Sequence, residues 1–210
     1  MDKINKDILK KILCSIVNEI NQDEEYLTQL DASTGDGDLG ITMAKGFKSI
    51  YEEIDNIDSD DMGIIFMKLG MKMNETVPST MGTLLSICLL KSAKEVKGLN
   101  EIGIAEIAEM CKSAVTGVCE RGKVKVGERT MVDALYPASE SLIKSSKEKV
   151  TLKEAFESAF KAAECGAEET KKLKPVHGRA AYYADKIIGK PDSGAVAVMS
   201  IFNGIKKSFE

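Results

Sequence analysis

Many zinc sites and catalytic nucleophile pairs are built from histidine and cysteine. This chain contains few residues of these types that suit such sites. His177 is the only histidine among 210 residues, which disfavours a His-based metal site or a His-paired nucleophile. It lies between Pro175 and Gly178, just before an expected helix, where a loop or surface role is favoured. The cysteines are odd in number, include no C-x-x-C pair and mostly fall on apolar helical faces, where free cysteine behaves as a small buried hydrophobe. We therefore expect core positions for Cys14, Cys88, Cys111, Cys119 and Cys165.

A basic charge balance and a long apolar run are also missing. The net charge of −4 argues against nucleic acid as the main partner, because that would require a basic face. No apolar stretch approaches the roughly 20 residues of a membrane span. The charged N-terminus lacks the uninterrupted apolar core of a signal peptide. We expect a cytoplasmic protein with no nucleic-acid or membrane partner.

Linkers and strand signals are absent as well. The four prolines are scattered, no segment is rich in glycine and serine, and no run alternates with the period of a strand. Neither G-x-x-x-x-G-K-[ST] nor a kinase-type glycine loop occurs, so any nucleotide site must be of another kind. The length suits one full-sized domain, and we expect residues 1–210 to form it.

Apolar residues instead recur with helical spacing. An isoleucine stands at every fourth position from Ile4 to Ile20. A short segment that begins with residues 23–27 is then expected to lead to Asp31. Helices connected by short links pack as antiparallel neighbours in a bundle or closed ring, which brings alternate connections to one end. The sequence predicts an all-α protein with its site at that end. Further helices are expected at 40–55, 61–75, 81–97, 102–120, 131–147, 151–172, 178–188 and 194–208.

Three carboxylates lie within eight residues at the start of the second expected helix. Asp31, Asp36 and Asp38 can converge because Gly35 and Gly37 allow a sharp turn. An EF-hand is excluded, since a loop begun at Asp36 lacks the required glycine and glutamate. Carboxylates without histidine or cysteine favour Mg²⁺ or Ca²⁺, and the helix start favours an anion. These features indicate a metal-bound phosphate, and the alternative is a solvated acidic turn that caps a helix.

Other loops have chemistry that suits a phosphate, although each alone has an ordinary explanation. Residues 77–83 offer hydroxyl groups before an apolar helix, as an N-cap would. Residues 121–133 form a basic, glycine-punctuated loop, or simply a helix C-cap and a turn. Arg179 could hold a phosphate bidentately or pair with a surface carboxylate. The segments G-R-A-A-Y and G-K-P-D-S-G-A bracket a short expected helix.

Together these loops resemble the dihydroxyacetone kinase L subunit. The motifs L-D-x-x-x-G-D-G-D-x-G, G-E-R-T-M-V-D-A-L-x-P-A, G-R-A-A-Y and I-G-K-P-D-S-G-A occur in the family's order and spacing across essentially the whole chain. The resemblance implies an eight-helix antiparallel barrel that binds ADP or ATP and two Mg²⁺ ions at one end. Asp31, Asp36 and Asp38 resemble its magnesium ligands. The positions that match its nucleotide contacts are Leu39, Gly40, Ile41, Thr42, Thr80, Met81, Gly122, Met131, Arg179, Asp192, Ser193 and Gly194.

The resemblance also implies an activity. In family members that stand alone, a phosphohistidine on a protein of the sugar phosphotransferase system phosphorylates bound ADP. The resulting ATP then phosphorylates a ketose held on a separate K subunit. Phosphoryl transfer needs mainly positioning and charge neutralisation, so Mg²⁺ and Arg179, the expected catalytic residue, could suffice without a protein base. Two alternatives are a regulatory protein that keeps the nucleotide fold and an ATP-dependent kinase subunit that exchanges its nucleotide freely.

Several positions depart from the family pattern. Leu39 stands where the family usually has histidine, and Thr42 where it has asparagine. A glycine-rich loop of the family is replaced by residues 78–83 (P-S-T-M-G-T), and its Asp-Pro-Gly by residues 192–194 (D-S-G). We expect the adenine end of the site to differ, as in a paralogue with another ketose or partner.

Overall fold

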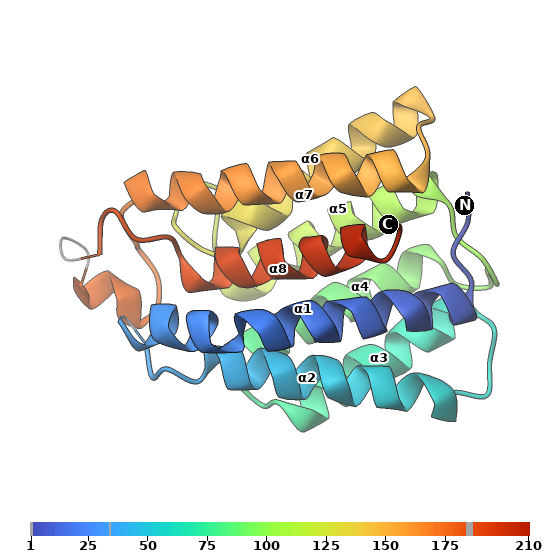
Figure 1. The fold of residues 1–210 in the computed structure, drawn as a ribbon, viewed down its shortest axis with the longest axis horizontal. Coiled ribbons are helices and arrows are strands. Elements are labelled where there is room, and N and C mark those ends of the chain that lie inside the picture. The colour runs from blue at the N-terminus through green and yellow to red at the C-terminus, as the bar shows by residue number, and fades with distance from the viewer. Residues whose placement is uncertain (1, 34, 184–186) are drawn as a thin grey trace.

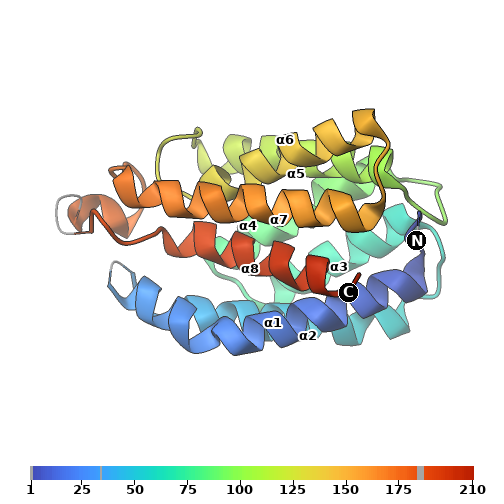
Figure 2. The same ribbon diagram turned by 45° about the horizontal axis from the view of Figure 1, so that its top comes forward.

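The computed structural model describes residues 2–33, 35–183 and 187–210, which form a barrel of eight α-helices with roughly parallel axes (Figures 1 and 2). Among these residues there is no β-strand, and one isolated bridge pairs Ile4 with Ile102 near the N-terminus. The predicted all-α class is therefore confirmed. The helices are α1 (Lys6–Ala32), α2 (Leu39–Glu53), α3 (Met62–Thr76), α4 (Thr80–Glu95), α5 (Ile104–Gly122), α6 (Val132–Glu148), α7 (Leu152–Glu169) and α8 (Ser193–Lys207).

The helices form a closed ring. Each packs against its neighbours in chain order, and α8 packs against α1. Because their directions alternate, α2, α4, α6 and α8 all begin at one end, on the left in Figure 1, and the chain termini lie at the other. The connections at the first end are residues 33–38, 77–79, 123–131 and 170–192. This topology brings four helix N-termini together.

Two sequence predictions on helix extent were wrong. Helix α1 is continuous to Ala32, without the expected separate segment from Asp23 to Leu27. The reason is that fully buried Leu27 continues the apolar stripe of Ile20, so this region keeps its helical contact with the barrel. The helix expected at 178–188 is instead a 3₁₀-helix over Arg179–Tyr183, and residues 184–186 lie outside the described residues. Among the described side chains of this segment Ile187 is buried, whereas Tyr182 and Ile188 are exposed, so these residues do little to hold a longer helix against the barrel.

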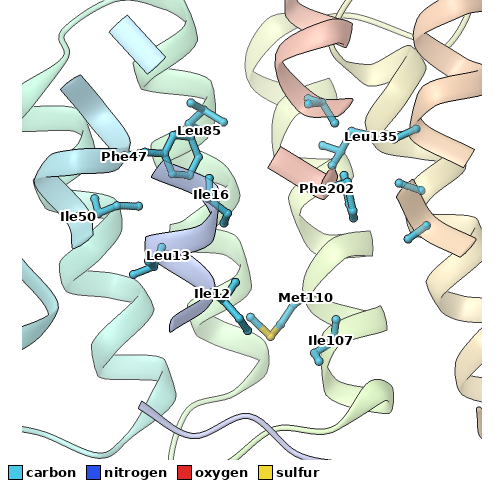
Figure 3. Packing of buried hydrophobic residues seen from close by; sticks show 14 of the residues in the cluster. Ile12, Leu13, Ile16, Phe47, Ile50, Leu85, Ile107, Met110, Leu135 and Phe202 are labelled. Carbon is cyan, nitrogen blue, oxygen red and sulfur yellow. The ribbon is translucent and has the colours of Figure 1, made fainter. Parts of the chain in front are cut away.

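The barrel interior is apolar. Side chains from opposite walls, among them Ile12, Phe47, Leu85, Met110 and Phe202, face the same interior (Figure 3). They line an apolar cavity of about 220 Å³. The interior has almost no polar lining, so a charged ligand must bind at an end of the barrel. Within the described part of the chain, no helix is both long and apolar enough to cross a membrane.

A polar seam between α1 and α8 closes the ring. Buried Glu19 accepts hydrogen bonds from Lys207 Nζ at 2.5 Å and from the Asn203 amide. One turn further along α1, Asp23 Oδ2 accepts a hydrogen bond of 2.6 Å from Ser200 Oγ. A buried carboxylate must be paired or hydrogen-bonded, so these contacts specify one register of α8 against α1. This register places the C-terminal end of α1 beside the N-terminal end of α8.

Candidate functional site

A cleft of about 790 Å³ opens at the end of the barrel where α2, α4, α6 and α8 begin. Its volume falls in the range of small-molecule sites, about 300–1,000 Å³. Both polar and apolar groups line it, unlike the interior cavity. Its walls are formed by Asp31, Gly35, Asp36, Asp38, Leu39, Thr42, Pro78, Ser79, Thr80, Met81, Leu84, Val118, Gly122, Val124, Arg129, Thr130, Met131, His177, Gly178, Ala180, Asp192, Ser193 and Gly194.

The three aspartates of the predicted metal site converge in this cleft. One carboxylate oxygen from each of Asp31, Asp36 and Asp38 lies within 4.8 Å of the others. Asp31, in the last turn of α1, fixes the loop, because its Oδ2 accepts the backbone N–H groups of Gly37 (3.0 Å) and Asp38 (3.2 Å). Gly37 has φ +73°, a conformation that glycine adopts without strain.

This donor set fits a hard divalent cation. The oxygens are carboxylate oxygens, and the described residues place no histidine or cysteine ligand within the cluster. Mg²⁺ takes one or two protein carboxylates per ion and completes its shell with water and phosphate oxygens, so an open cleft beside the cluster suits it. Ser193 Oγ lies 3.5 Å from Asp31 Oδ1, which brings the start of α8 to the same point. The three aspartates would hold the ion on the α1 side of the cleft.

The start of α2 lies directly after the aspartates. Asp38 is its N-cap residue, but the Asp38 side chain does not cap the helix, and the first α2 backbone bond runs from Thr42 N–H to Asp38 O (2.9 Å). The N–H groups of residues 39–41 come before that bond, so they have no acceptor within the helix. They lie at the positive end of the helix dipole. Leu39 and Thr42 line the cleft. A phosphate could be held by these amides.

Two predicted contacts of this helix lie differently. Gly40 is packed against α1, where an added Cβ would stand 2.0 Å from Glu24 O. Ile41 is 56% exposed. Neither residue is among those that line the cleft, so Gly40 and Ile41 could contribute to binding only through their main-chain amides. That role stays a prediction.

The starts of α4, α6 and α8 supply most of the remaining predicted nucleotide contacts. Ser79 caps α4 through the Gly82 amide (3.0 Å), and Asp192 caps α8 through the Ala195 amide (2.9 Å). At Gly194 an added Cβ would lie 3.2 Å from Met81 Cε and 3.4 Å from Met131 Cβ, so these helix starts meet. The predicted nucleotide positions that line the cleft are Leu39, Thr42, Thr80, Met81, Gly122, Met131, Asp192, Ser193 and Gly194.

Arg179 begins the 3₁₀-helix Arg179–Tyr183 in the connection between α7 and α8. Its side chain lies outside the described part of the structure, and its catalytic role stays a prediction. Gly178 and Ala180, on either side of it, both line the cleft.

Sequence reasoning missed two groups in the cleft wall. His177 was expected to have a loop or surface role and was not among the predicted site residues. It lines the cleft, and its Nε2 lies 2.6 Å from Glu128 Oε2. This hydrogen bond, with another from the Lys125 amide, lowers the pKa of Glu128. Arg129 is the second group, and it is only 5% exposed. The sequence feature that could have identified Arg129 is its place in the motif G-E-R-T-M-V-D. By itself this loop suggests only a turn.

Asp192 has the strongest electrostatic perturbation in this wall. Burial raises the pKa of its carboxyl group to about 6, the Ala195 hydrogen bond and the charge of Arg129 oppose the rise, and the charge of Asp133 adds to it. The folded protein thus holds this proton more tightly than the unfolded chain. The resulting stabilisation is present at acidic pH and is lost as the pH rises through 6.

We predict a pH-dependent difference in stability between the wild-type protein and Asp192→Asn. The compared quantity is the free energy of unfolding of the wild type minus that of the variant, both without nucleotide or Mg²⁺. This difference should fall by about 2 kcal/mol between about pH 4.5 and 7.5, because only the wild type can lose this proton. Asparagine keeps an oxygen that can accept the Ala195 N–H. Urea unfolding at several pH values measures the difference. A constant difference across this range would contradict the assignment.

Known proteins are similar to the chain over most of its length. The DAK2 domain family matches residues 33–207. The PEP-dependent dihydroxyacetone kinase, ADP-binding subunit DhaL, of Escherichia coli (strain K12) is 33% identical over 177 residues, which are 84% of this chain and 84% of that subunit. The PEP-dependent dihydroxyacetone kinase 2, ADP-binding subunit DhaL, of Listeria innocua is 30% identical over 91% of this chain and 89% of that protein.

A solved structure shares the fold. The dihydroxyacetone kinase of C. freundii in complex with AMP-PNP and Mg²⁺ has a TM-score of 0.72 and 25% identity to this chain. The match covers 99% of this chain and 35% of the kinase, so the chain spans about a third of that protein. The family match, the subunit relatives and the shared barrel all identify one family. The chain belongs to the DAK2 domain family, together with the DhaL subunits of dihydroxyacetone kinases.

Proposed function

We propose that this protein is the nucleotide-binding L subunit of a kinase for dihydroxyacetone or a related ketose, a phosphotransferase. The observation that carries the proposal is the three-aspartate cluster beside four helix N-termini in one cleft. Carboxylates and helix starts attract opposite charges, so together they suit a complex that carries both, such as a nucleotide phosphate with Mg²⁺. The names of the E. coli and L. innocua relatives, which include ADP binding, support this choice.

Each part of the cleft would contact a different part of ADP or ATP. Asp31, Asp36 and Asp38 would hold Mg²⁺, and we propose two ions. Bound Mg²⁺ supplies charge neutralisation at the phosphoryl oxygens. The main-chain amides at the starts of α2 and α8 would hold the phosphates, and the apolar side chains of Leu84 and Val118 offer a wall for the adenine ring.

The reaction would be a relay of one phosphoryl group. It passes from a histidine nitrogen of a phosphotransferase-system protein to the terminal phosphate oxygen of ADP, and the N–P bond breaks. It then passes from ATP to a hydroxyl oxygen of the ketose, whose proton is released, and ADP is restored. The ketose would be bound by a partner K subunit. The PEP-dependent names of the relatives support this donor class over free ATP.

Two other functions fit the same cleft. An ATP-dependent subunit would exchange its nucleotide freely, and a regulatory paralogue would bind nucleotide without transfer. The regulatory alternative is favoured by residues 78–81 in the cleft wall, where proline, serine and methionine replace a glycine-rich loop. The intact aspartate cluster favours the kinase subunit, because a pure scaffold gains nothing from three carboxylates that repel one another.

Native mass spectrometry of the freshly purified protein tests the proposal first. We expect a complex with ADP and two Mg²⁺ ions, and denaturation should release ADP. Turnover with the partner proteins then separates the alternatives, since a phosphohistidine donor should support ketose phosphorylation and free ATP should not. A protein that binds neither ADP nor ATP with Mg²⁺ would contradict the nucleotide function itself.

A further inference from the structure

Arg129 is a buried cation in the cleft wall, and it is not among the metal or nucleotide positions predicted from the sequence. It lies in the loop between α5 and α6, two residues after Gly127 and three before the first residue of α6. It has φ +60°, a left-handed conformation that side chains other than glycine adopt at a cost of about 1–2 kcal/mol. Arg129 is only 5% exposed. Residues held in such backbone conformations often lie at binding sites, so the contacts of the guanidinium matter.

One nitrogen of the guanidinium is anchored. Arg129 Nη1 donates to the carbonyl oxygens of Thr170 (3.1 Å) and Leu173 (3.3 Å), at the C-terminal end of α7. These bonds use only part of a group that carries five N–H donors in a fixed fork. The anchor also holds the fork in one orientation, so little rotational freedom would be lost on binding a ligand.

The other N–H donors of the guanidinium are on Nε and Nη2. Within residues 2–33, 35–183 and 187–210 they make no hydrogen bond, and no carboxylate oxygen approaches Arg129 within ion-pair distance. In the same residues no fully buried side-chain nitrogen or oxygen lacks a partner. Nε and Nη2 are therefore not sealed inside the protein. Because Arg129 lines the cleft, that space is where they can meet a ligand.

Two carboxylates near this part of the cleft wall, Asp133 and Asp192, accept backbone amide hydrogens. Asp133 accepts the amide hydrogens of Gly127 (Oδ1) and Thr130 (Oδ2, 2.7 Å). Asp192 Oδ2 caps α8 through the Ala195 amide, and its charge interacts with that of Arg129 at longer range. The charge of Asp192 lowers the cost of the buried Arg129 cation, and the two form no ion pair among the described residues.

We propose that Arg129 binds the phosphate chain of the nucleotide. Ser193 Oγ lies 3.5 Å from Asp31 Oδ1, and the charge of its neighbour Asp192 acts on Arg129, so the start of α8 lies near both the aspartate cluster and Arg129 in the same cleft. A planar guanidinium with two free donors matches two phosphate oxygens. This inference rests on the proposed nucleotide function.

The test compares ligands that differ only in phosphate number. Isothermal titration with excess Mg²⁺ gives the Kd of adenosine, AMP, ADP and ATP for the wild type, Arg129→Met and the control Lys123→Met. Lys123 is in the same loop and also has positive φ (52°), but it is exposed outside the cleft wall. We expect Arg129→Met to weaken ADP and ATP binding by about 10- to 100-fold and adenosine binding less than about threefold. Lys123→Met should bind all four ligands like the wild type.

Three outcomes would overturn the inference. Equal loss of affinity for adenosine and ADP would make Arg129 a purely structural brace of α7. Unchanged ADP affinity in a folded Arg129→Met would remove any role in binding while leaving the nucleotide function intact. Failure of the wild type to bind ADP or ATP would contradict the proposed function and this inference together. If Arg129→Met does not fold, Arg129→Lys decides, since a single ammonium should still cost ADP about 3- to 10-fold and spare adenosine.

Discussion

Asp36→Asn should weaken Mg²⁺-dependent ADP binding by at least about a hundredfold and abolish measurable phosphoryl transfer. The substitution keeps the size of the side chain and removes one of three negative charges that converge within 4.8 Å. Loss of groups that merely orient a metal ligand costs about 10- to 100-fold in affinity or activity, so loss of a ligand should cost more. Asp36 is exposed, and we expect its replacement to change the free energy of unfolding by less than about 0.5 kcal/mol.

A matched control separates charge at the site from charge in general. Asp60 is also an exposed loop aspartate, but it precedes α3 at the opposite end of the barrel. Asp60→Asn should leave ADP affinity unchanged with and without Mg²⁺. Titration of ADP into each variant over a range of Mg²⁺ concentrations measures the effect. If Asp36→Asn kept the wild-type dependence on Mg²⁺, the metal assignment would be wrong.

The convergence of the three aspartates could be predicted from sequence because its geometry is local. Asp31 and Asp38 are seven residues apart, and the glycines between them permit the tight turn that folds back onto the end of α1. The helices were predictable for a similar reason, since apolar spacing within one segment indicates a buried face. The same reasoning failed after Ile20, where a separate short segment was expected although the apolar stripe continues through Leu27 in one helix.

The cleft wall formed by Arg129 and His177 depends on contacts between distant segments. Arg129 is held by carbonyl groups 41 and 44 residues further along the chain, and His177 pairs with a glutamate 49 residues away. No spacing within either loop encodes these contacts. An isolated basic loop is more often a solvated surface, so the sequence alone could not favour a buried guanidinium. The barrel topology was needed to place both loops at one end.

Gly40 illustrates how one residue can serve the packing of helices and the site together. Its place in the aspartate motif suggested only a phosphate contact. In the structure an added Cβ would lie 2.0 Å from Glu24 O, 2.4 Å from Thr28 Oγ1 and 2.9 Å from Glu24 C. Glycine therefore lets α2 begin directly against α1. That close approach keeps the α2 amides next to Asp31 and its partners.

Gly40→Ala should accordingly destabilise the fold by about 2 kcal/mol or more and lower the melting temperature by about 4–8 °C. Alanine favours a helix over glycine by about 1 kcal/mol, but the clash is with a backbone oxygen of α1, which cannot move without moving that helix. Displacement of the α2 start should also weaken ADP binding, although all three aspartates remain.

Gly46→Ala is the matched control for this argument, because it makes the same change in the same helix. There an added Cβ would lie 2.6 Å from Met73 Sδ, part of a flexible side chain that can shift, so the helix preference of alanine offsets most of the cost. We expect its free energy of unfolding to stay within about 1 kcal/mol of the wild type, and ADP affinity to be kept. Thermal melts and ADP titrations of both variants measure the difference. If Gly40→Ala were as stable as Gly46→Ala and bound ADP equally well, the start of α2 would not depend on its contact with α1.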